Sequence, residues 1–300
     1  MLADAAVSEF VAAHGRVPGS ELVVLALGRL GGRALTHASD LDLIYLFTGD
    51  HLAESDGPRP LGATTYYNRL AQRVTGAMSV PTAAGKLYDV DTRLRPQGAQ
   101  GPLVVTLDSF ERYQREEAWT WEHMALLRAR PVYGSDAAKA EVEQIVADLL
   151  AIRRDPVKLA ADAAEMRGKI AAHKPPKGAL DIKGGPGGLV DLEFAMQVTQ
   201  LVSGRCHDPN ISAALACMKA AELVPPEVID AHGLLARMLV MLRLTAPDGE
   251  PATAAARGLV AAACGEPGWP QLLAAHDMAR QEIANWWASI RPITPVKQET

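Results

Sequence analysis

The sequence predicts an α+β protein, in which a small mixed sheet with helices packed on it is followed by an all-α helical bundle. Residues 1–135 combine short apolar runs, rich in branched residues, with stretches of helical periodicity. Residues 136–300 consist almost wholly of helix-like stretches separated by proline and glycine. Because 300 residues are enough for two domains, we expect one domain over residues 1–135 and a second over residues 136–300.

Three strands are predicted in the first domain. Residues 22–27 form a short apolar run bounded by a glycine, and residues 41–47 form a second such run. Residues 86–95 form the third strand, which Pro96 ends because proline cannot continue a sheet ladder. Strand, helix and strand in this order predict a small mixed sheet covered by helices.

The predicted helices follow from apolar residues at helical spacing. In the first domain we expect helices over residues 64–78 and 107–130. The second domain is predicted to hold a bundle of four or more helices. Their expected ranges are 159–170, 189–202 ending at Gly204, 226–244 opened by Pro226, and 272–290.

Composition excludes several classes of protein. The net charge of −5 argues against a protein that binds nucleic acid regardless of sequence, since such proteins are usually basic. No apolar run approaches the roughly 20 residues that span a bilayer, and the N-terminus lacks the basic region of a signal peptide. Cys206, Cys217 and Cys264 show no metal-ligand spacing or disulfide framework. We therefore expect three small, semi-buried side chains in a reducing cytoplasm.

Two aspartates at the start of the second strand indicate a metal site. Asp40 and Asp42 follow Ser39, and strand alternation sends both carboxylates to one face of the sheet. Adjacent carboxylates repel each other unless a cation lies between them. Hard oxygen ligands select Mg²⁺ or Mn²⁺ rather than zinc. The alternative, a solvated strand edge, is disfavoured by the apolar flanks and by the glycine pair that precedes the strand.

The glycine-rich turn ahead of these carboxylates indicates a phosphate site. Gly31 and Gly32 allow backbone N–H groups to approach a phosphate, at a helix N-terminus that favours anions. A metal beside a phosphate cradle is what phosphoryl or nucleotidyl transfer requires. The run G-R-L-G-G is not G-x-G-x-x-G and no G-K-[ST] follows, so Rossmann and P-loop sites are disfavoured.

A third carboxylate is expected on the neighbouring strand. We choose Asp91, with Asp89 on the same face as the alternative. Arg93 and Arg95 also share a face, and a guanidinium suits bidentate recognition of phosphate oxygens. Ordinary salt bridges to the three carboxylates explain these arginines equally well.

Longer stretches resemble known families. The glycine pair, the D-x-D pair and a distant third aspartate resemble the signature of polymerase-β-like nucleotidyltransferases. A more specific resemblance, to glutamine-synthetase adenylyltransferases, spans about residues 20–205. It is carried by YYNRLAQR (66–73), PTAAGKLYDVDTRLRP (81–96), GPLV (101–104), FERYQREEAWTWEHMALLRAR (110–130) and KGGPGGLVDLEF (183–194).

That resemblance implies a function and a set of site residues. It implies that ATP gives AMP to a tyrosine hydroxyl of glutamine synthetase, that pyrophosphate leaves, and that Mg²⁺ assists. The implied metal ligands and catalytic residues are Asp40, Asp42 and Asp91. The implied nucleotide-binding residues are Gly31, Gly32, Ser39, Arg29, Arg93 and Arg95.

Family enzymes carry two nucleotidyltransferase units in tandem, and the E-A-W-T-W-E-H block resembles the second, adenylylating unit. The resemblance implies the PII signal protein as a partner. Because this chain holds one unit, a missing N-terminal unit is the second implied partner. Arg29 replaces the usual lysine, which keeps the charge but changes its shape, and we expect activity to survive. Phosphorolytic removal of AMP is an alternative that the same block disfavours. A non-catalytic docking module is another, which the three intact aspartates disfavour.

Two further motifs allow two interpretations each. For the segment around Trp119 and Trp121, one interpretation is that both tryptophans pack in the core. The other is that Glu116 or Glu122 lies near the site and helps to position the tyrosine or metal. The G-G-P-G-G run enters a helix whose first turn is acidic, which indicates capping. The alternative is a contact between bundle and catalytic domain in which Lys183, directly before this run, faces phosphate or protein substrate.

Overall fold

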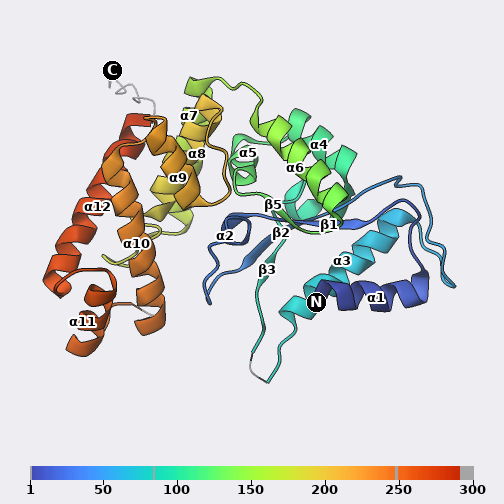
Figure 1. Ribbon diagram of the computed structural model, residues 1–300, viewed down its shortest axis with the longest axis horizontal. Helices are drawn as coiled ribbons and strands as arrows, with labels where there is room; N and C mark the ends of the chain where they lie inside the picture. The colour runs from blue at the N-terminus through green and yellow to red at the C-terminus, as the bar shows by residue number, and fades with distance from the viewer. Residues whose placement is uncertain (1, 84, 247–248, 291–300) are drawn as a thin grey trace, which may run out of the picture. The chain divides into compact units, whose positions relative to one another are not determined.

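Figure 1 shows the chain as a computed structural model that describes residues 2–83, 85–246 and 249–290. It divides into two compact units. Unit 1 comprises Met1–Ile152 with Asp208–Asn210, and unit 2 comprises Arg153–His207 with Ile211–Thr300. In the described part of the chain, unit 1 holds a five-stranded mixed sheet with helices and unit 2 holds helices without strands. The predicted α+β class is therefore confirmed.

Unit 1 carries the sheet and the helices that cover it. Its elements are α1 (Leu2–His14), β1 (Leu22–Ala26), α2 (Gly28–Gly31), β2 (Leu41–Phe47), α3 (Ala63–Ser79), β3 (Val90–Asp91), the 3₁₀ turn η1 (Gly98–Gln100), β4 (Val104–Thr106), α4 (Leu107–Glu116), α5 (Thr120–Leu126), β5 (Arg130–Tyr133) and α6 (Asp136–Leu150).

The sheet has β2 at its centre. Strand order is β3-β2-β1-β5, and β4 also pairs with β2. β1 runs antiparallel to β2 and β5, whereas β3 and β4 run parallel to β2. This mixture of directions confirms the predicted mixed sheet.

The two faces of the sheet bury different residues. On one face, alternate residues of β1 and β2, among them Leu41, Leu43 and Tyr45, pack with α1 and α3 (Figure 1). Phe10 of α1 and Tyr66 of α3 meet edge to face in this core, with ring centroids 4.9 Å apart. On the other face lie α4 and α6, which contact the strands β2, β4 and β5. Because side chains alternate along a strand, Asp42 projects from the face opposite Leu41 and Leu43.

The structure corrects several of the predicted elements. The strand expected over residues 86–95 is only two residues long, because a turn closes directly after it, with Arg95 N donating to Thr92 O. The helix expected over residues 107–130 is two helices and a strand, since α4 ends at Glu116 and β5 begins at Arg130. α1, β4, α9 and α11 were not predicted, and α6 had no range of its own. The helix expected over residues 64–78 is α3.

The expected division after residue 135 remains a prediction about domains. The compact units divide after Ile152, because α6 packs against α4, α5 and β5. A three-residue segment, Asp208–Asn210, also belongs to unit 1.

Unit 2 is the predicted helical bundle. Its helices are α7 (Pro156–His173), α8 (Leu189–Ser203), α9 (Ile211–Ala220), α10 (Pro226–Thr245), α11 (Ala254–Ala263) and α12 (Trp269–Ile290). α10 contacts α8, α9, α11 and α12, and α8 also contacts α7 and α12 (Figure 1). Across the part of the chain that the structure describes, no helix is long and apolar enough to cross a membrane.

The G-G-P-G-G motif forms the turn that leads into α8. Asp191, in the first turn of α8, accepts a hydrogen bond from Gly187 N (2.6 Å) and pairs with the buried Arg167 of α7 (2.5 Å). Arg167 also donates to Gly184 O (3.0 Å). Gly187 has φ +71°, and a Cβ there would lie 2.0 Å from Arg280 O. The N-cap of α8, Gly188, has no side-chain cap hydrogen bond, so capping by the acidic first turn stays a prediction. The motif ties three helices of unit 2 together.

The cysteines differ from expectation. Cys206, in the loop after α8, and Cys217, in α9, form a disulfide with Cα atoms 5.6 Å apart. The expectation of three unpaired thiols is therefore wrong for this pair, whose separation of 11 residues carries no signal of its own in the sequence. Cys264 is a free, buried thiol, as expected.

Candidate active site

Three aspartates converge where β2 and β3 begin to pair. The parallel register places Asp42 directly beside Asp91, and Leu41 N donates to Asp89 O (2.8 Å) to hold the strands together. Asp40 precedes β2 and shares a face with Asp42. Each of the three carboxylates offers an oxygen, and these oxygens lie within 4.8 Å of one another. The structure thus brings together the three residues that the sequence singled out, hereafter the triad.

The triad oxygens fit a hard divalent cation. Ligand oxygens around an octahedral Mg²⁺, at about 2.0–2.1 Å from the ion, lie within about 4.2 Å of one another. The 4.8 Å span therefore needs only small side-chain rotations. All donors are carboxylate oxygens, which suit Mg²⁺ or Mn²⁺ and not zinc.

Asp89 lies outside the triad. Its exposed carboxylate pairs with Lys86, three residues earlier. Both residues line a cavity of about 800 Å³ that is formed by residues 37–40 and 86–93 and that also contains Asp40 and Asp91. This volume falls in the range of small-molecule sites, which is roughly 300–1,000 Å³.

Gly28 is a site residue that sequence reasoning missed. Its φ is +53°, and a Cβ at this position would lie 2.2 Å from Asp42 Oδ2. Leu27 N donates to Asp42 O (2.9 Å), so the end of β1 is fixed against the start of β2. Only glycine leaves room for the Asp42 carboxylate at this point. The signal available in the sequence was the G-R-L-G-G run, of which Gly28 is the first glycine.

The glycine pair is required for close packing. A Cβ on Gly31 would lie 1.8 Å from Arg128 O, and one on Gly32 would lie 2.7 Å from Pro209 O. Their N–H groups donate to Leu27 O (2.9 Å) and Gly28 O (3.1 Å). The pair ends α2, so the expected position at a helix N-terminus is wrong. The close approach that the sequence indicated is made to protein backbone. Phosphate binding by this pair stays a prediction.

Two residues outside the motif hold the glycine turn. Arg130, the first residue of β5, donates from Nε to Gly31 O (3.0 Å) and from Nη2 to Leu30 O (2.9 Å). Asn210 donates from Nδ2 to Gly32 O (3.0 Å). Burial, and then the charge of Arg33, lower the pKa of Arg130. Sequence reasoning missed both residues, and for Asn210 no local motif points to the contact.

Ser39 and Arg29 have different surroundings. Ser39 is buried, and its Oγ accepts from Thr36 N (3.0 Å), which closes the turn directly before Asp40. Arg29 is the second residue of α2 and is half-buried. Ser39 therefore fixes the approach to the triad, and nucleotide binding by either residue stays a prediction.

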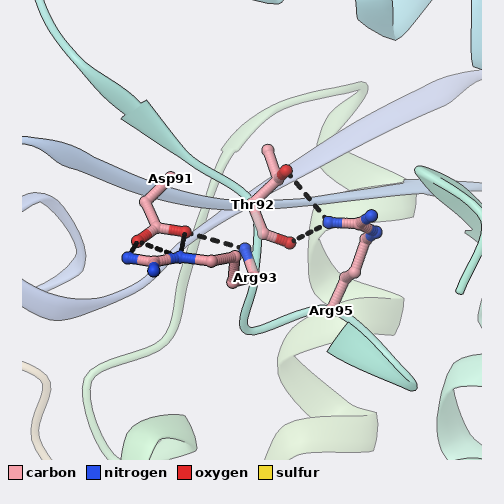
Figure 2. A network of polar contacts seen from close by, with 4 residues as sticks. All are labelled: Asp91, Thr92, Arg93 and Arg95. Atoms are coloured by element: carbon pink, nitrogen blue, oxygen red, sulfur yellow. Dashed lines mark hydrogen bonds and ion pairs between the residues drawn. The ribbon is translucent and has the colours of Figure 1, made fainter. Parts of the chain in front are cut away.

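Arg93 lies on the third carboxylate of the triad. Figure 2 shows its guanidinium folded back onto Asp91. Nε donates to both carboxylate oxygens (3.0 Å each), Nη2 donates to Oδ2, and the backbone N donates to Oδ1 (2.8 Å). Hydrogen bonding and charge from Asp91, followed by the charges of Asp40 and Asp42, raise the pKa of Arg93.

Arg95 points elsewhere. Its guanidinium donates to Thr92 O (2.8 Å) and Thr92 Oγ1 (3.1 Å), as Figure 2 shows. Further bonds reach the carbonyls of Ala99, Gly101 and Pro102 at 3.1–3.3 Å. Arg95 therefore shapes the loop after β3. Its predicted phosphate contact remains a prediction.

In the segment of Trp119 and Trp121, the Glu122 side chain is buried and the Trp119 side chain is exposed. Glu122 accepts from Trp119 N (2.9 Å) and from Tyr113 OH (3.1 Å), and burial raises the pKa of Glu122. Trp119 is 70% exposed, so core packing is wrong for this residue, whereas Trp121 is half-buried. Glu122 thus fixes the start of α5, and among the described residues it is not part of the triad cluster.

The mixed sheet, with its carboxylate cluster beside a glycine turn, resembles that of polymerase-β-like nucleotidyltransferases. Residues 1–145 match the family model described as glutamate-ammonia ligase adenylyltransferase. The chain belongs to that family over these residues.

Relatives named bifunctional glutamine synthetase adenylyltransferase/adenylyl-removing enzyme extend the similarity. The Brucella suis protein is 50% identical over 199 residues, which are 66% of this chain and 20% of the relative. The Rhizobium meliloti protein is 46% identical over 221 residues, 72% of this chain and 22% of the relative. The Agrobacterium fabrum protein is 40% identical over 272 residues, 87% of this chain and 27% of the relative. The chain thus spans about a fifth to a quarter of the length of these relatives.

The helical unit has a similarity of its own. Residues 164–245, which run from α7 into α10, match the family model described as GlnD PII-uridylyltransferase.

Proposed function

We propose that this chain transfers AMP from ATP to a tyrosine hydroxyl of glutamine synthetase and releases pyrophosphate. The observation that carries the proposal is the convergence of Asp40, Asp42 and Asp91, in a segment that matches an adenylyltransferase family. The names of the relatives supply the protein substrate. The chain corresponds, in this proposal, to the second, adenylylating unit of such enzymes.

The triad residues hold Mg²⁺ in this reaction. Mg²⁺ supplies charge neutralisation at the phosphates and stabilises the attacking and leaving oxygens. Asp42 and Asp91 are fixed relative to each other by strand pairing, and Ser39 closes the turn that fixes Asp40. The cavity beside them is large enough for a nucleotide phosphate chain.

We further assign the nucleotide to six residues, of which Ser39 and Arg93 line this cavity. Gly31, Gly32, Ser39, Arg29, Arg93 and Arg95 are the proposed nucleotide-binding set. Arg93 is the member that lies on the triad itself and that lines the cavity. It is therefore the arginine best placed to meet phosphate oxygens.

The decisive experiment mixes the purified chain with glutamine synthetase, Mg²⁺ and α-labelled ATP. The parent chain should label glutamine synthetase, and Asp91→Asn should lose at least about 10²-fold in rate, as displaced catalytic groups do. Asp89→Asn is the matched control, because it removes the same charge from the same cavity outside the triad. Its effect should be far smaller.

Four other results of these experiments would overturn the proposal or the choice of Asp91. Equal losses in both variants would make Asp89 a site residue and overturn the choice of Asp91. Full activity of Asp91→Asn would overturn the metal assignment. Prompt formation of ADP from adenylylated glutamine synthetase and phosphate, with no forward labelling, would replace the proposal by AMP removal. Binding of glutamine synthetase without binding of Mg-ATP would indicate a docking module.

We also propose PII as a regulatory partner of the helical unit. The match of residues 164–245 to a PII-uridylyltransferase family supports this, because that family is named for the same signal protein. Calorimetric titration of PII into the chain tests it, and no heat of binding to the well-folded chain would contradict it.

The proposed reaction also suggests a partner unit and a cellular location for the chain. We propose an N-terminal nucleotidyltransferase unit as a partner, since the matched residues make up only 20% to 27% of the length of the relatives. We also propose a cytoplasmic location, because ATP is supplied there. Co-purification with the native partner unit and cell fractionation test these two proposals.

A further inference from the structure

Arg93 binds Asp91, a carboxylate of the triad, through both its side chain and its backbone N (Figure 2). Its guanidinium bonds both carboxylate oxygens, and its backbone N bonds Oδ1. The Arg93 side chain is 76% exposed, whereas that of Asp91 is 19% exposed. An exposed cation thus lies on a largely buried carboxylate.

The ion pair conflicts with metal binding at the same carboxylate. A guanidinium and a divalent cation a few ångströms apart repel each other, by about 1 kcal/mol per pair of unit charges at 4 Å even in water. An exposed ion pair contributes only about 0–1 kcal/mol. The side chain can therefore leave Asp91 at small cost when a metal ion arrives.

The backbone does not need to move with the side chain. The bond from Arg93 N to Asp91 Oδ1 does not involve the guanidinium, so residue 93 stays beside the triad. The released guanidinium lies on the wall of the 800 Å³ cavity, and its planar fork matches phosphate oxygens. Arg95 cannot take this role while its donors bond five acceptors in its own loop.

We propose that Arg93 exchanges partners during the reaction cycle. It neutralises Asp91 in the metal-free protein, leaves when the triad binds its metal ion, and then holds the phosphates of the nucleotide. This inference rests on the proposed function. Arg93 consequently opposes metal binding in the absence of nucleotide and favours nucleotide binding once metal is present.

The two opposite effects provide the test. Mn²⁺ binding without nucleotide is measured by calorimetry and by the electron paramagnetic resonance signal of free Mn²⁺. Arg93→Gln should bind Mn²⁺ about three- to tenfold more tightly than the parent chain, since an attached cation and its ion pair are lost. With Mn²⁺ saturating, it should bind α,β-methylene-ATP about tenfold or more weakly, the usual loss for a hydrogen bond to a charged group.

Two further variants make the comparison specific. Lys86→Gln removes a cation from the same cavity that pairs with Asp89 and not with the triad, so both affinities should change far less. Arg93→Lys keeps the charge and loses the fork, so Mn²⁺ affinity should stay near the parent value while nucleotide affinity falls. It also serves if Arg93→Gln does not fold.

The outcomes separate this inference from the proposed function. Unchanged or weaker Mn²⁺ binding by Arg93→Gln, or unchanged nucleotide binding, would overturn the exchange while leaving the metal site intact. Mn²⁺ binding by Asp40→Asn/Asp42→Asn that equals the parent chain would overturn the metal site itself. If Arg93→Gln and Lys86→Gln changed both affinities equally, the effect of Arg93 would be that of any cation in the cavity. That result would overturn the exchange.

Discussion

Replacing Gly28 with alanine should disable the triad without unfolding the protein. Gly28 has φ +53°, a conformation that costs an ordinary residue about 1–2 kcal/mol. The new methyl group would also lie 2.2 Å from Asp42 Oδ2, whereas real Cβ atoms essentially never approach another atom within 3.0 Å. The carboxylate oxygen must therefore retreat by most of an ångström.

That displacement is large on the scale of metal coordination, where ligand distances vary by only about 0.2 Å. Gly28→Ala should thus weaken Mn²⁺ binding by about 10- to 100-fold, comparable to the loss of a group that orients a ligand. The rate of AMP transfer should fall on the order of 10²-fold. Mn²⁺ titration and transfer of labelled AMP measure the two losses, and urea denaturation measures stability.

Gly19→Ala is the matched control. Gly19 has φ +69°, and nothing lies within 4 Å of its added Cβ. It carries the same conformational cost, about 1–2 kcal/mol, without touching the triad. If Gly28→Ala bound Mn²⁺ as tightly as Gly19→Ala, the reasoning from the Asp42 contact would be refuted.

Three further predictions concern burial and cross-linking. Asp191→Ala strands the buried Arg167, so the free energy of unfolding by urea should fall by about 3–5 kcal/mol; a loss under about 1 kcal/mol would contradict this. Burial raises the pKa of Glu122 above 4.5, so its contribution to stability is present below pH 4.5 and is lost as pH rises through the folded pKa. Unfolding free energies of the parent should therefore fall relative to Glu122→Gln across that window, and parallel pH profiles would argue otherwise. Thiol titration of denatured protein should find one thiol before reduction and three after, and reduction of Cys206–Cys217 should cost about 2–3 kcal/mol; three thiols at the outset would rule out the bond.

The long, periodic elements could be predicted from the sequence, and the short ones could not. β1, β2, α3 and the helices α7, α8, α10 and α12 each present one apolar face or run over many residues. β3 and β4 hold two and three residues, too few for any periodicity, and exist because β2 offers an edge to pair with. β5 contains Pro131, which argued against a strand.

The site divides in the same way. The aspartates were predictable because carboxylates two apart on a strand have few structural uses, and register then places Asp91 beside Asp42. The partners of Arg93 and Arg95 were not predictable, because both arginines lie on the same face of the expected strand and only the turn after β3 sends them to different acceptors. Asn210 reaches Gly32 across 178 residues of sequence, a contact that no local pattern encodes.

The segment Asp208–Asn210 determines how this protein can be dissected. These residues lie between two helices of unit 2 along the chain yet belong to unit 1, where they contact the glycine turn. A fragment cut after Ile152 would keep the triad and lose the amide that holds Gly32 O. If such a fragment were inactive, the loss of residues 208–210 would explain it. The result would therefore not count against the role of the triad. The smallest piece that preserves the glycine turn is therefore discontinuous in sequence, and its ends must be joined by design.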